Sequence, residues 1–264
     1  MWENMIIPGD SIEIDNSENV KITIGPGIYK NPITQTIIPA NAGLLSQKIN
    51  KKHTNQVIFI ESNSKRYIPQ VNDFVIGTIT GVIGESYKVQ LQQYSTPSIL
   101  PMMAFPNATK KNRPNLQNGQ VVYARVSQAI PEIDIELECI DPTTGKEGGF
   151  GLLDESGYVF DINLNFAREL LFNPNCIYLD KLAKKIKFEI AIGINGKVWL
   201  KCGDGLTKIK QENKNDDEDN ESPIDNTNYI KDLKSTLIAA KYLIHCQHTK
   251  QQDLDQLLKT LFNL

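Results

Sequence analysis

The stretch Phe74-Val75-Ile76-Gly77-Thr78-Ile79-Thr80-Gly81-Val82-Ile83 decides the fold class of the central part of the chain. Its β-branched residues favour a strand, and Gly77 and Gly81 interrupt it. Glycines inside a strand suit a strong bend, which a small closed barrel requires. The stretch therefore predicts a bent strand of a small β-barrel.

The residues that follow this strand supply the rest of such a barrel. Residues 87–91 alternate between apolar and polar, a weaker strand is expected at 99–103, and another at 121–126. Residues 133–139 alternate again, with apolar side chains on one face and carboxylates on the other. Five strands with one long loop match a Greek-key barrel of the OB type.

The residues before the barrel predict a small all-β domain. Short alternating segments are separated by turns, of which Gly25-Pro26-Gly27 gives the strongest signal. Residues 47–56 are polar and are expected to form a loop, whereas residues 57–60 are expected to form a buried strand.

Beyond residue 150 the hydrophobic period changes from that of strands to that of helices. The expected elements are a strand, two helices, two strands and two further helices, at residues 157–162, 164–172, 176–185, 188–192, 197–201, 228–246 and around 254–262. The long helix carries Ile230, Leu233, Leu237, Ala240 and Ile244 on one face. This order of elements is that of a KH domain. The fold class is therefore multidomain, mainly β with an α+β part.

Charge is distributed unevenly along the chain, although the net charge is only −3. The acidic stretch 211–225 holds seven carboxylates and one lysine, and we expect it to be a disordered insert. The 46 residues between Glu85 and Glu132 contain no carboxylate and five cations. The barrel is therefore expected to be basic on part of its surface.

Loops on OB barrels often bind single-stranded nucleic acid, with cations contacting the phosphates. The candidates for such contacts are Lys110, Lys111 and Arg113 in the loop 106–114, and Lys65 and Arg66 before the first barrel strand. Tyr67 could stack on a base, although core packing is the more common role of such a residue. A solvated loop that is basic for solubility remains the alternative.

Several other classes of protein are disfavoured. No apolar run approaches the about 18 residues of a membrane-spanning helix, and the first residues do not read as a secretory signal. The four cysteines are scattered, and His245-Cys246-Gln247-His248 lacks a second ligand pair, so we expect reduced, buried thiols and no metal or other cofactor. The carboxylates of residues 133–139 are expected to form a solvated strand face and not a catalytic two-metal cluster.

Six motifs along the chain together resemble one family. They are Pro8-Gly9-Asp10, Gly25-Pro26-Gly27-Ile28-Tyr29, Ser64-Lys65-Arg66-Tyr67-Ile68-Pro69, Asp73-Phe74-Val75-Ile76-Gly77, Ala108-Thr109-Lys110-Lys111-Asn112-Arg113-Pro114 and Gly193-Ile194-Asn195-Gly196-Lys197-Val198-Trp199. In this order they closely resemble the S1/KH cap subunits of the eukaryotic RNA exosome, the ribosomal RNA-processing protein forty family.

The resemblance implies an N-terminal β domain at 1–62, an S1-type OB-fold domain at 63–150 and a KH-type domain at 151–264. It implies a non-catalytic subunit that stabilises a ring of RNase PH-like subunits beside other cap subunits. It further implies that this subunit guides single-stranded RNA to a 3′→5′ exonuclease, for degradation and for processing that includes ribosomal RNA. The implied location is the nucleus and nucleolus, and also the cytoplasm, with no membrane partner.

The KH part is expected to act as a scaffold. The junction between its first two helices, Phe172-Asn173-Pro174-Asn175, lacks the GxxG sequence with which KH domains clamp nucleotides. Gly193, Asn195 and Gly196 lie instead in a turn between two strands, and in the resembled family this motif packs between barrel and KH domain. RNA contact is therefore expected on the barrel loop.

Two other functions remain open. The chain could be a purely structural brace of the ring, with incidental RNA contact. An enzyme that acts on RNA is disfavoured, because the sequence suggests neither clustered carboxylates nor a Ser/His/Asp or Cys/His pairing.

Overall fold

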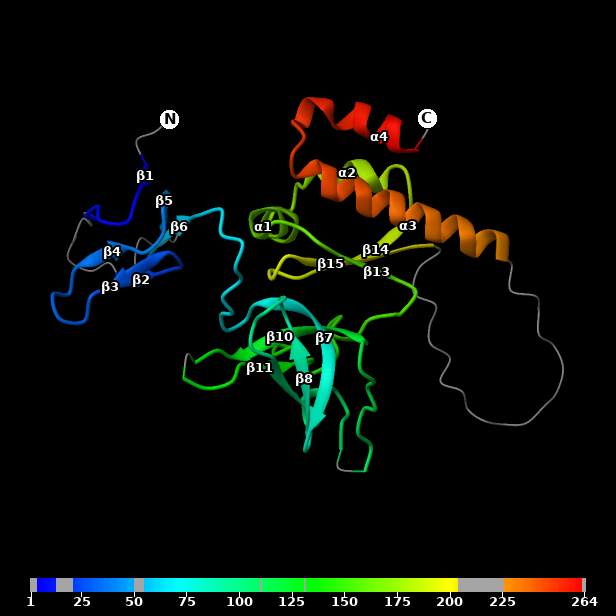
Figure 1. Ribbon diagram of the computed structural model, residues 1–264, viewed down its shortest axis with the longest axis horizontal. Coiled ribbons are helices and arrows are strands. Elements are labelled where there is room, and N and C mark those ends of the chain that lie inside the picture. The colour runs from blue at the N-terminus through cyan, green and yellow to red at the C-terminus, as the bar shows by residue number, and fades with distance from the viewer. Residues whose placement is uncertain are drawn as a thin grey trace. The chain divides into compact units, whose positions relative to one another are not determined.

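The structure is a computed structural model, and it describes residues 4–12, 21–49, 55–109, 111–130, 132–203 and 226–262. The chain divides into two compact units, Met1–Lys65 and Arg66–Leu264 (Figure 1). The acidic stretch 211–225, for which we predicted disorder, lies outside the described residues.

The first unit is an all-β domain, as predicted. Its strands are β1 (Met5–Ile6), β2 (Lys21–Ile24), β3 (Ile28–Lys30), β4 (Ile37–Pro39), β5 (Gly43–Ile49) and β6 (Asn55–Glu61). A four-stranded sheet has the order β1-β5-β6-β2, and β3 pairs with β4. The loop predicted at 47–56 is wrong at both ends, because β5 and β6 extend into it. Gln47 and Gln56 lie on these two neighbouring strands, and Gln56 Nε2 donates to Gln47 Oε1 at 3.0 Å.

The second unit begins with a closed barrel. Its elements are β7 (Phe74–Ile83), β8 (Ser86–Gln90), β9 (Ser98–Pro101), the 3₁₀ turn η1 (Met102–Ala104), β10 (Val121–Gln128), β11 (Glu136–Glu138) and β12 (Gly151–Leu152). The sheet order is β11-β9-β8-β7-β10-β12, and β11 also pairs with β10, which closes the barrel. Strands β9 and β11 are parallel. The five-stranded barrel of the OB type is therefore confirmed.

Strand β7 has the irregularity that its glycines predict. Its register with β8 shifts between Ile79 and Gly81, which is a β-bulge. Gly77 lies so close to β8 that a Cβ atom there would be 2.2 Å from Cγ1 of Val89. Val89 itself is fully buried in the barrel core, so Gly77 provides the space that this side chain fills.

The last barrel strand is shorter than the predicted 133–139. Pairing covers only β11, and Ile133 is 56% exposed while Leu137 is buried. The carboxylates of this segment do not all face solvent freely, because Glu138 forms an ion pair with Arg125.

The KH part follows with the predicted order of elements. These are β13 (Tyr158–Asp161), α1 (Leu164–Phe172), α2 (Ile177–Ala183), β14 (Phe188–Ile192), β15 (Lys197–Cys202), α3 (Asn226–Cys246), the 3₁₀ turn η2 (Gln251–Asp253) and α4 (Leu254–Phe262). The sheet order is β13-β15-β14. Helices cover one face of this sheet and the barrel lies towards the other (Figure 1).

Helix α3 buries only the C-terminal part of the face that its apolar spacing suggests, where Ala240 is 1% exposed and Ile244 packs against the core. Three residues of the predicted face are exposed: Ile230 by 49%, Leu233 by 44% and Leu237 by 39%. The helix instead approaches β15 through Thr236, whose hydroxyl accepts a hydrogen bond from the backbone N–H of Cys202 at 3.0 Å. All four cysteines are free and buried, as expected. Within the described part of the chain, no helix is long and apolar enough to cross a bilayer.

Asn195, in the turn between β14 and β15, joins the KH part to the barrel. Its side chain is 4% exposed, and its Nδ2 donates to the carbonyl oxygens of Ile76, at 2.8 Å, and Leu91, at 2.7 Å. In return, the backbone N–H of Ile76 donates to Asn195 Oδ1 at 3.2 Å. Next to it, the N–H of Ile194 donates to Phe74 O at 2.8 Å. The turn therefore completes the hydrogen bonding of β7.

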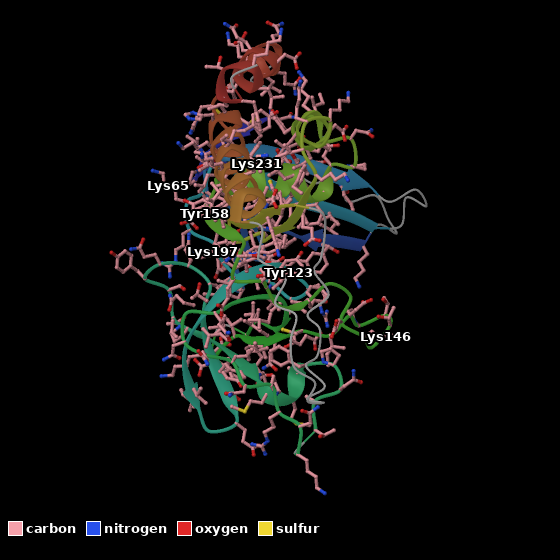
Figure 2. All side chains as sticks on the ribbon, turned by 90° about the vertical axis from the view of Figure 1, so that its right-hand side faces the viewer. Lys65, Tyr123, Lys146, Tyr158, Lys197 and Lys231 are labelled. Carbon is pink, nitrogen blue, oxygen red and sulfur yellow. The ribbon has the colours of Figure 1, made fainter. Side chains whose placement is uncertain are left out.

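The glycines on either side of Asn195 allow this close approach. A Cβ atom at Gly193 would lie 2.2 Å from Asn195 Oδ1 and 2.8 Å from the amide nitrogen of Ile76. Gly196 has a φ of +82°, and a Cβ atom there would lie 2.6 Å from Ile162 O. Tyr123 adds a further contact, because its hydroxyl donates to Ile192 O at 3.4 Å at the junction of barrel and sheet (Figure 2).

Replacing Asn195 with Ala should lower the free energy of unfolding of the full chain by about 3–5 kcal/mol, because three buried backbone groups lose their partners. Asn195→Asp should destabilise at least as much, since its carboxylate would face two carbonyl oxygens. Chemical denaturation followed by fluorescence measures both. Asn118→Ala, at an exposed position, is the matched control, and a loss below about 1 kcal/mol for Asn195→Ala would contradict the assigned role.

Candidate nucleic-acid interface

Tyr87 on β8 fixes the long loop between η1 and β10. Its side chain is 2% exposed, its hydroxyl donates to Pro114 O, and the backbone N–H of Leu116 donates to the same hydroxyl at 3.2 Å. At the other end of the loop, the N–H of Cys139 donates to Ala104 O at 2.8 Å. Both ends of the loop are therefore attached to the barrel, and the segment between them projects into solvent.

Thr109 and Asn112 close a tight turn within this projecting segment. The N–H of Thr109 donates to Asn112 O at 3.0 Å, and the N–H of Asn112 donates to Thr109 O at 3.1 Å and to Thr109 Oγ1 at 3.0 Å. The two residues between them in sequence are Lys110 and Lys111. Lys111 is exposed, and Lys110 lies outside the described residues.

Arg113 follows the turn and is paired with Glu85, which lies between β7 and β8. The distance from Arg113 Nη2 to Glu85 Oε1 is 2.7 Å, and the side chains are 37% and 70% exposed. An ion pair with this exposure stabilises by about 0–1 kcal/mol. Glu85 therefore positions Arg113 but binds it only weakly. Another anion, such as a phosphate, can replace the carboxylate.

The other two predicted cations lie elsewhere. Lys65 ends the first unit and Arg66 begins the second, and each already has an interaction partner. Arg66 precedes Tyr67, whose backbone N–H donates to Gln92 Oε1 at 3.0 Å. Gln92 follows the end of β8 that is opposite to Glu85. The structure thus brings Lys111 and Arg113 together on one loop and places Arg66 at the other end of the barrel.

Tyr67 is part of the core and not a stacking platform. It is 7% exposed, and its hydroxyl donates to Asp73 Oδ2 at 2.7 Å. Burial raises the pKa of the Tyr67 hydroxyl, and burial also raises the pKa of the Asp73 carboxyl. The common packing role weighed for this residue is therefore confirmed.

The surface charge of the barrel is lower than its composition suggests. Arg125 belongs to the stretch without carboxylates, yet its side chain is only 12% exposed and pairs with Glu138. Its guanidinium also donates to the side-chain oxygen of Asn72. Across the described ranges, no group of three or more His, Cys, Asp or Glu side chains is arranged to hold a metal ion.

Sequence reasoning missed two residues that shape this site, Glu85 and Tyr87. Glu85 was visible only as the last carboxylate before the stretch that lacks them. Tyr87 was visible only as an apolar position of an alternating strand. Neither pattern reveals that the side chains reach across to residues 113–116, because that contact depends on which loops meet at one end of the barrel.

Comparisons with known proteins cover all three parts of the chain. Residues 22–66 match the family described as exosome complex exonuclease Rrp40 N-terminal domain, residues 67–151 the S1 domain of exosome complex component RRP40, and residues 157–206 a KH domain. The chain is 54% identical to exosome complex component RRP40 of Saccharomyces cerevisiae over 197 residues, which cover 75% of this chain and 81% of that protein.

The chain belongs to the RRP40 family. It is also 39% identical to the Schizosaccharomyces pombe relative over 196 residues, covering 74% of this chain and 77% of that protein. The Drosophila melanogaster relative is 34% identical over 200 residues, covering 75% and 82%. The family resemblance drawn from the six motifs is therefore confirmed. The match to the S1 domain covers residues 67–151, so the loop described above lies within the S1 domain.

Replacing Tyr87 with Phe should leave the barrel folded and increase hydrogen exchange at the amide of Leu116. The free energy of unfolding should fall by about 1–2 kcal/mol, because a buried amide loses its acceptor. Hydrogen exchange with mass spectrometry measures the effect on residues 102–116. Tyr29→Phe is the control, since that side chain is 54% exposed. Unchanged exchange in the loop would show that the hydroxyl does not hold it.

Proposed function

We propose that the chain is a non-catalytic, RNA-binding cap subunit of the RNA exosome. The observation that carries this proposal is the 54% identity to a curated exosome complex component over three quarters of the chain. An OB-type barrel supports an RNA-binding role, because such barrels bind single-stranded nucleic acid through charged loops and grooves.

Lys110, Lys111 and Arg113 are proposed to contact the RNA backbone. This proposal is supported by the turn between Thr109 and Asn112, which flank the two lysines in the sequence, and by the attachment of the same loop to the barrel through Tyr87. A preformed loop loses little conformational entropy on binding, which favours its use as a phosphate contact. Lys65 and Arg66 are weaker candidates, since they belong to different units and are already engaged.

The KH part is proposed to serve as the scaffold of the barrel. Gly193, Asn195 and Gly196 hold the β14–β15 turn against β7 and Leu91. A motif used in this way fixes the orientation of the barrel relative to the KH sheet. The RNA contacts are therefore assigned to the barrel.

The partners and location are likewise proposals. We expect assembly with RNase PH-like ring subunits, with other cap subunits and with a catalytic 3′→5′ exonuclease, and no membrane partner. The relatives carry the name of exosome complex components, which supports assembly into such a complex. The expected location is the nucleus and nucleolus, and also the cytoplasm, with ribosomal RNA processing among the activities of the complex.

One observation favours the second candidate function, a structural brace of the ring. Met5 on β1 and Leu44 on β5 are direct partners across the strands, and they are 51% and 46% exposed. Exposed apolar side chains on the edge strand β1 and on its neighbour β5 are suited to contact with another protein. Bracing and RNA binding use different units and are compatible.

Replacing Lys110, Lys111 and Arg113 together with Ala should weaken capture of single-stranded RNA by the reconstituted complex. The slope of log K against log salt should become shallower by about 0.7 for each lost phosphate contact. Binding titrations at several salt concentrations measure this slope. The control is Lys231, Lys234 and Lys241 of α3, all exposed, replaced together with Ala. Normal assembly with unchanged RNA affinity in the loop variant would favour the brace.

Glu85→Gln should have the opposite effect, because it releases Arg113 from its ion pair. RNA affinity should rise by up to about fivefold, the limit set by an exposed pair worth at most about 1 kcal/mol, and salt dependence should become steeper. Glu132→Gln makes the same charge change at the other boundary of the carboxylate-free stretch. An equal gain in both variants would mean that net charge, and not the release of Arg113, is responsible.

A further inference from the structure

Tyr94, in the loop between β8 and β9, is unusually exposed for an aromatic residue. Its side chain is 95% accessible, the highest value among the large apolar side chains of the described residues. Within that part of the chain, its hydroxyl has no hydrogen-bond partner and its ring packs on no other ring. Packing within the chain therefore does not explain the presence of Tyr at this position.

The backbone at Tyr94 makes this choice of residue unfavourable. Its φ is +62°, in the left-handed region that residues with a Cβ atom rarely adopt. Gly or Asn would adopt it more readily. An aromatic side chain at a strained backbone position, which the fold itself does not use, points to a contact outside the chain.

The loop that carries Tyr94 is held by its own hydrogen bonds. The N–H of Ser95 donates to Gln92 O at 3.2 Å, and the Ser95 hydroxyl donates to the same oxygen at 2.8 Å. Gln90 Nε2 donates to Ser95 O at 2.9 Å. The ring of Tyr94 is therefore presented by an ordered loop, which lowers the entropy lost when the ring makes a contact.

We propose that Tyr94 stacks on a base of single-stranded RNA. This inference rests on the proposed function of RNA binding and adds a contact that is separate from the Lys111 loop. Aromatic rings that stack on unpaired bases are a recurring feature of single-strand binding. The ring belongs to the 46-residue stretch without carboxylates, so no acidic neighbour in that stretch repels the RNA backbone.

The surroundings of Tyr94 fit a base better than a protein pocket. The nearest exposed residues, Gln93 and Thr96, are polar, and Pro97 after them is also exposed. Amide and hydroxyl groups can hydrogen-bond to the edges of a stacked base. A central aromatic contact in a protein interface is instead surrounded by residues that exclude water from it. The chemistry of this loop tip therefore favours RNA.

Tyr94 and the Lys111 loop lie at opposite ends of strand β8. Glu85, which pairs with Arg113, precedes the first residue of β8, and the Tyr94 loop follows its last residue. Five residues of strand span about 17 Å. An RNA that contacts both ends must therefore extend over several nucleotides, so very short RNAs can reach only one of the two contacts.

The test is RNA binding by the reconstituted complex, with fluorescent oligouridine titrated at several salt concentrations. Tyr94→Ala should weaken binding at least about fivefold, because one stacked base is lost. The slope of log K against log salt should stay unchanged, because stacking neutralises no phosphate. Tyr94→Phe and Tyr94→Trp should retain most of the affinity, since both keep an aromatic face.

Tyr94→Gly separates a binding role from a folding role. It should raise the thermal stability of the full chain, because glycine accepts the left-handed backbone, and it should still weaken RNA binding as much as Tyr94→Ala. Wild-type affinity in both variants would overturn the inference. So would reduced incorporation into the complex with unchanged RNA affinity, which would indicate a protein contact.

RNA binding by the variant of Lys110, Lys111 and Arg113 distinguishes failure of the stacking contact from failure of the proposed RNA-binding function. If the variant of Lys110, Lys111 and Arg113 loses salt dependence while Tyr94→Ala binds normally, the RNA-binding function stands and the stacking contact is rejected. If neither variant affects RNA binding, the proposed RNA-binding function itself fails.

Discussion

The second unit depends on the carboxamide of Asn195. Strand β7 contributes to two strand pairs of the barrel, yet at Ile76 both its N–H and its C=O are bonded to a side chain from the KH part. An amide can do this because it carries an acceptor and two donors side by side. The third bond, to Leu91 O, reaches the segment after β8. Barrel and KH sheet are thus joined by a buried polar contact, next to the backbone bond from Ile194 to Phe74.

The same physical reasoning explains which features could be predicted from the sequence. Strand β7 and helix α1 have the predicted bounds, because β-branched composition and helical periodicity are local signals that packing did not override. The polar end of β5 was missed, since Gln47 accepts a hydrogen bond from Gln56 on β6, a contact that local hydrophobic patterning does not reveal. For α3, the N-terminal part of the predicted face is exposed, because the helix contacts β15 there through the Thr236 hydroxyl. Ala240 and Ile244, further along the same face, are packed as predicted.

The candidate site shows the limit of composition as a guide. The sequence shows which cations belong to the loop, but it does not show which cations of the barrel are already paired. Arg125 is bound to Glu138, and Arg113 is held by Glu85. Neither carboxylate belongs to the carboxylate-free stretch between Glu85 and Glu132. Glu85 is its N-terminal boundary, and Glu138 lies beyond its C-terminal boundary. Pairing of this kind is decided by which strand ends meet, and only the three-dimensional structure contains that information.

The contact at Asn195 also has a consequence for how the chain is made. Asn195 is 119 residues later in the sequence than Ile76. At a synthesis rate of roughly 5–20 residues per second, β7 emerges on the order of 10 s before its partner. During that interval the polar backbone of the strand at Ile76 has no permanent partner on this side. The barrel strands pair among themselves, so the contact that joins the barrel to the KH part forms only after the turn between β14 and β15 has been translated.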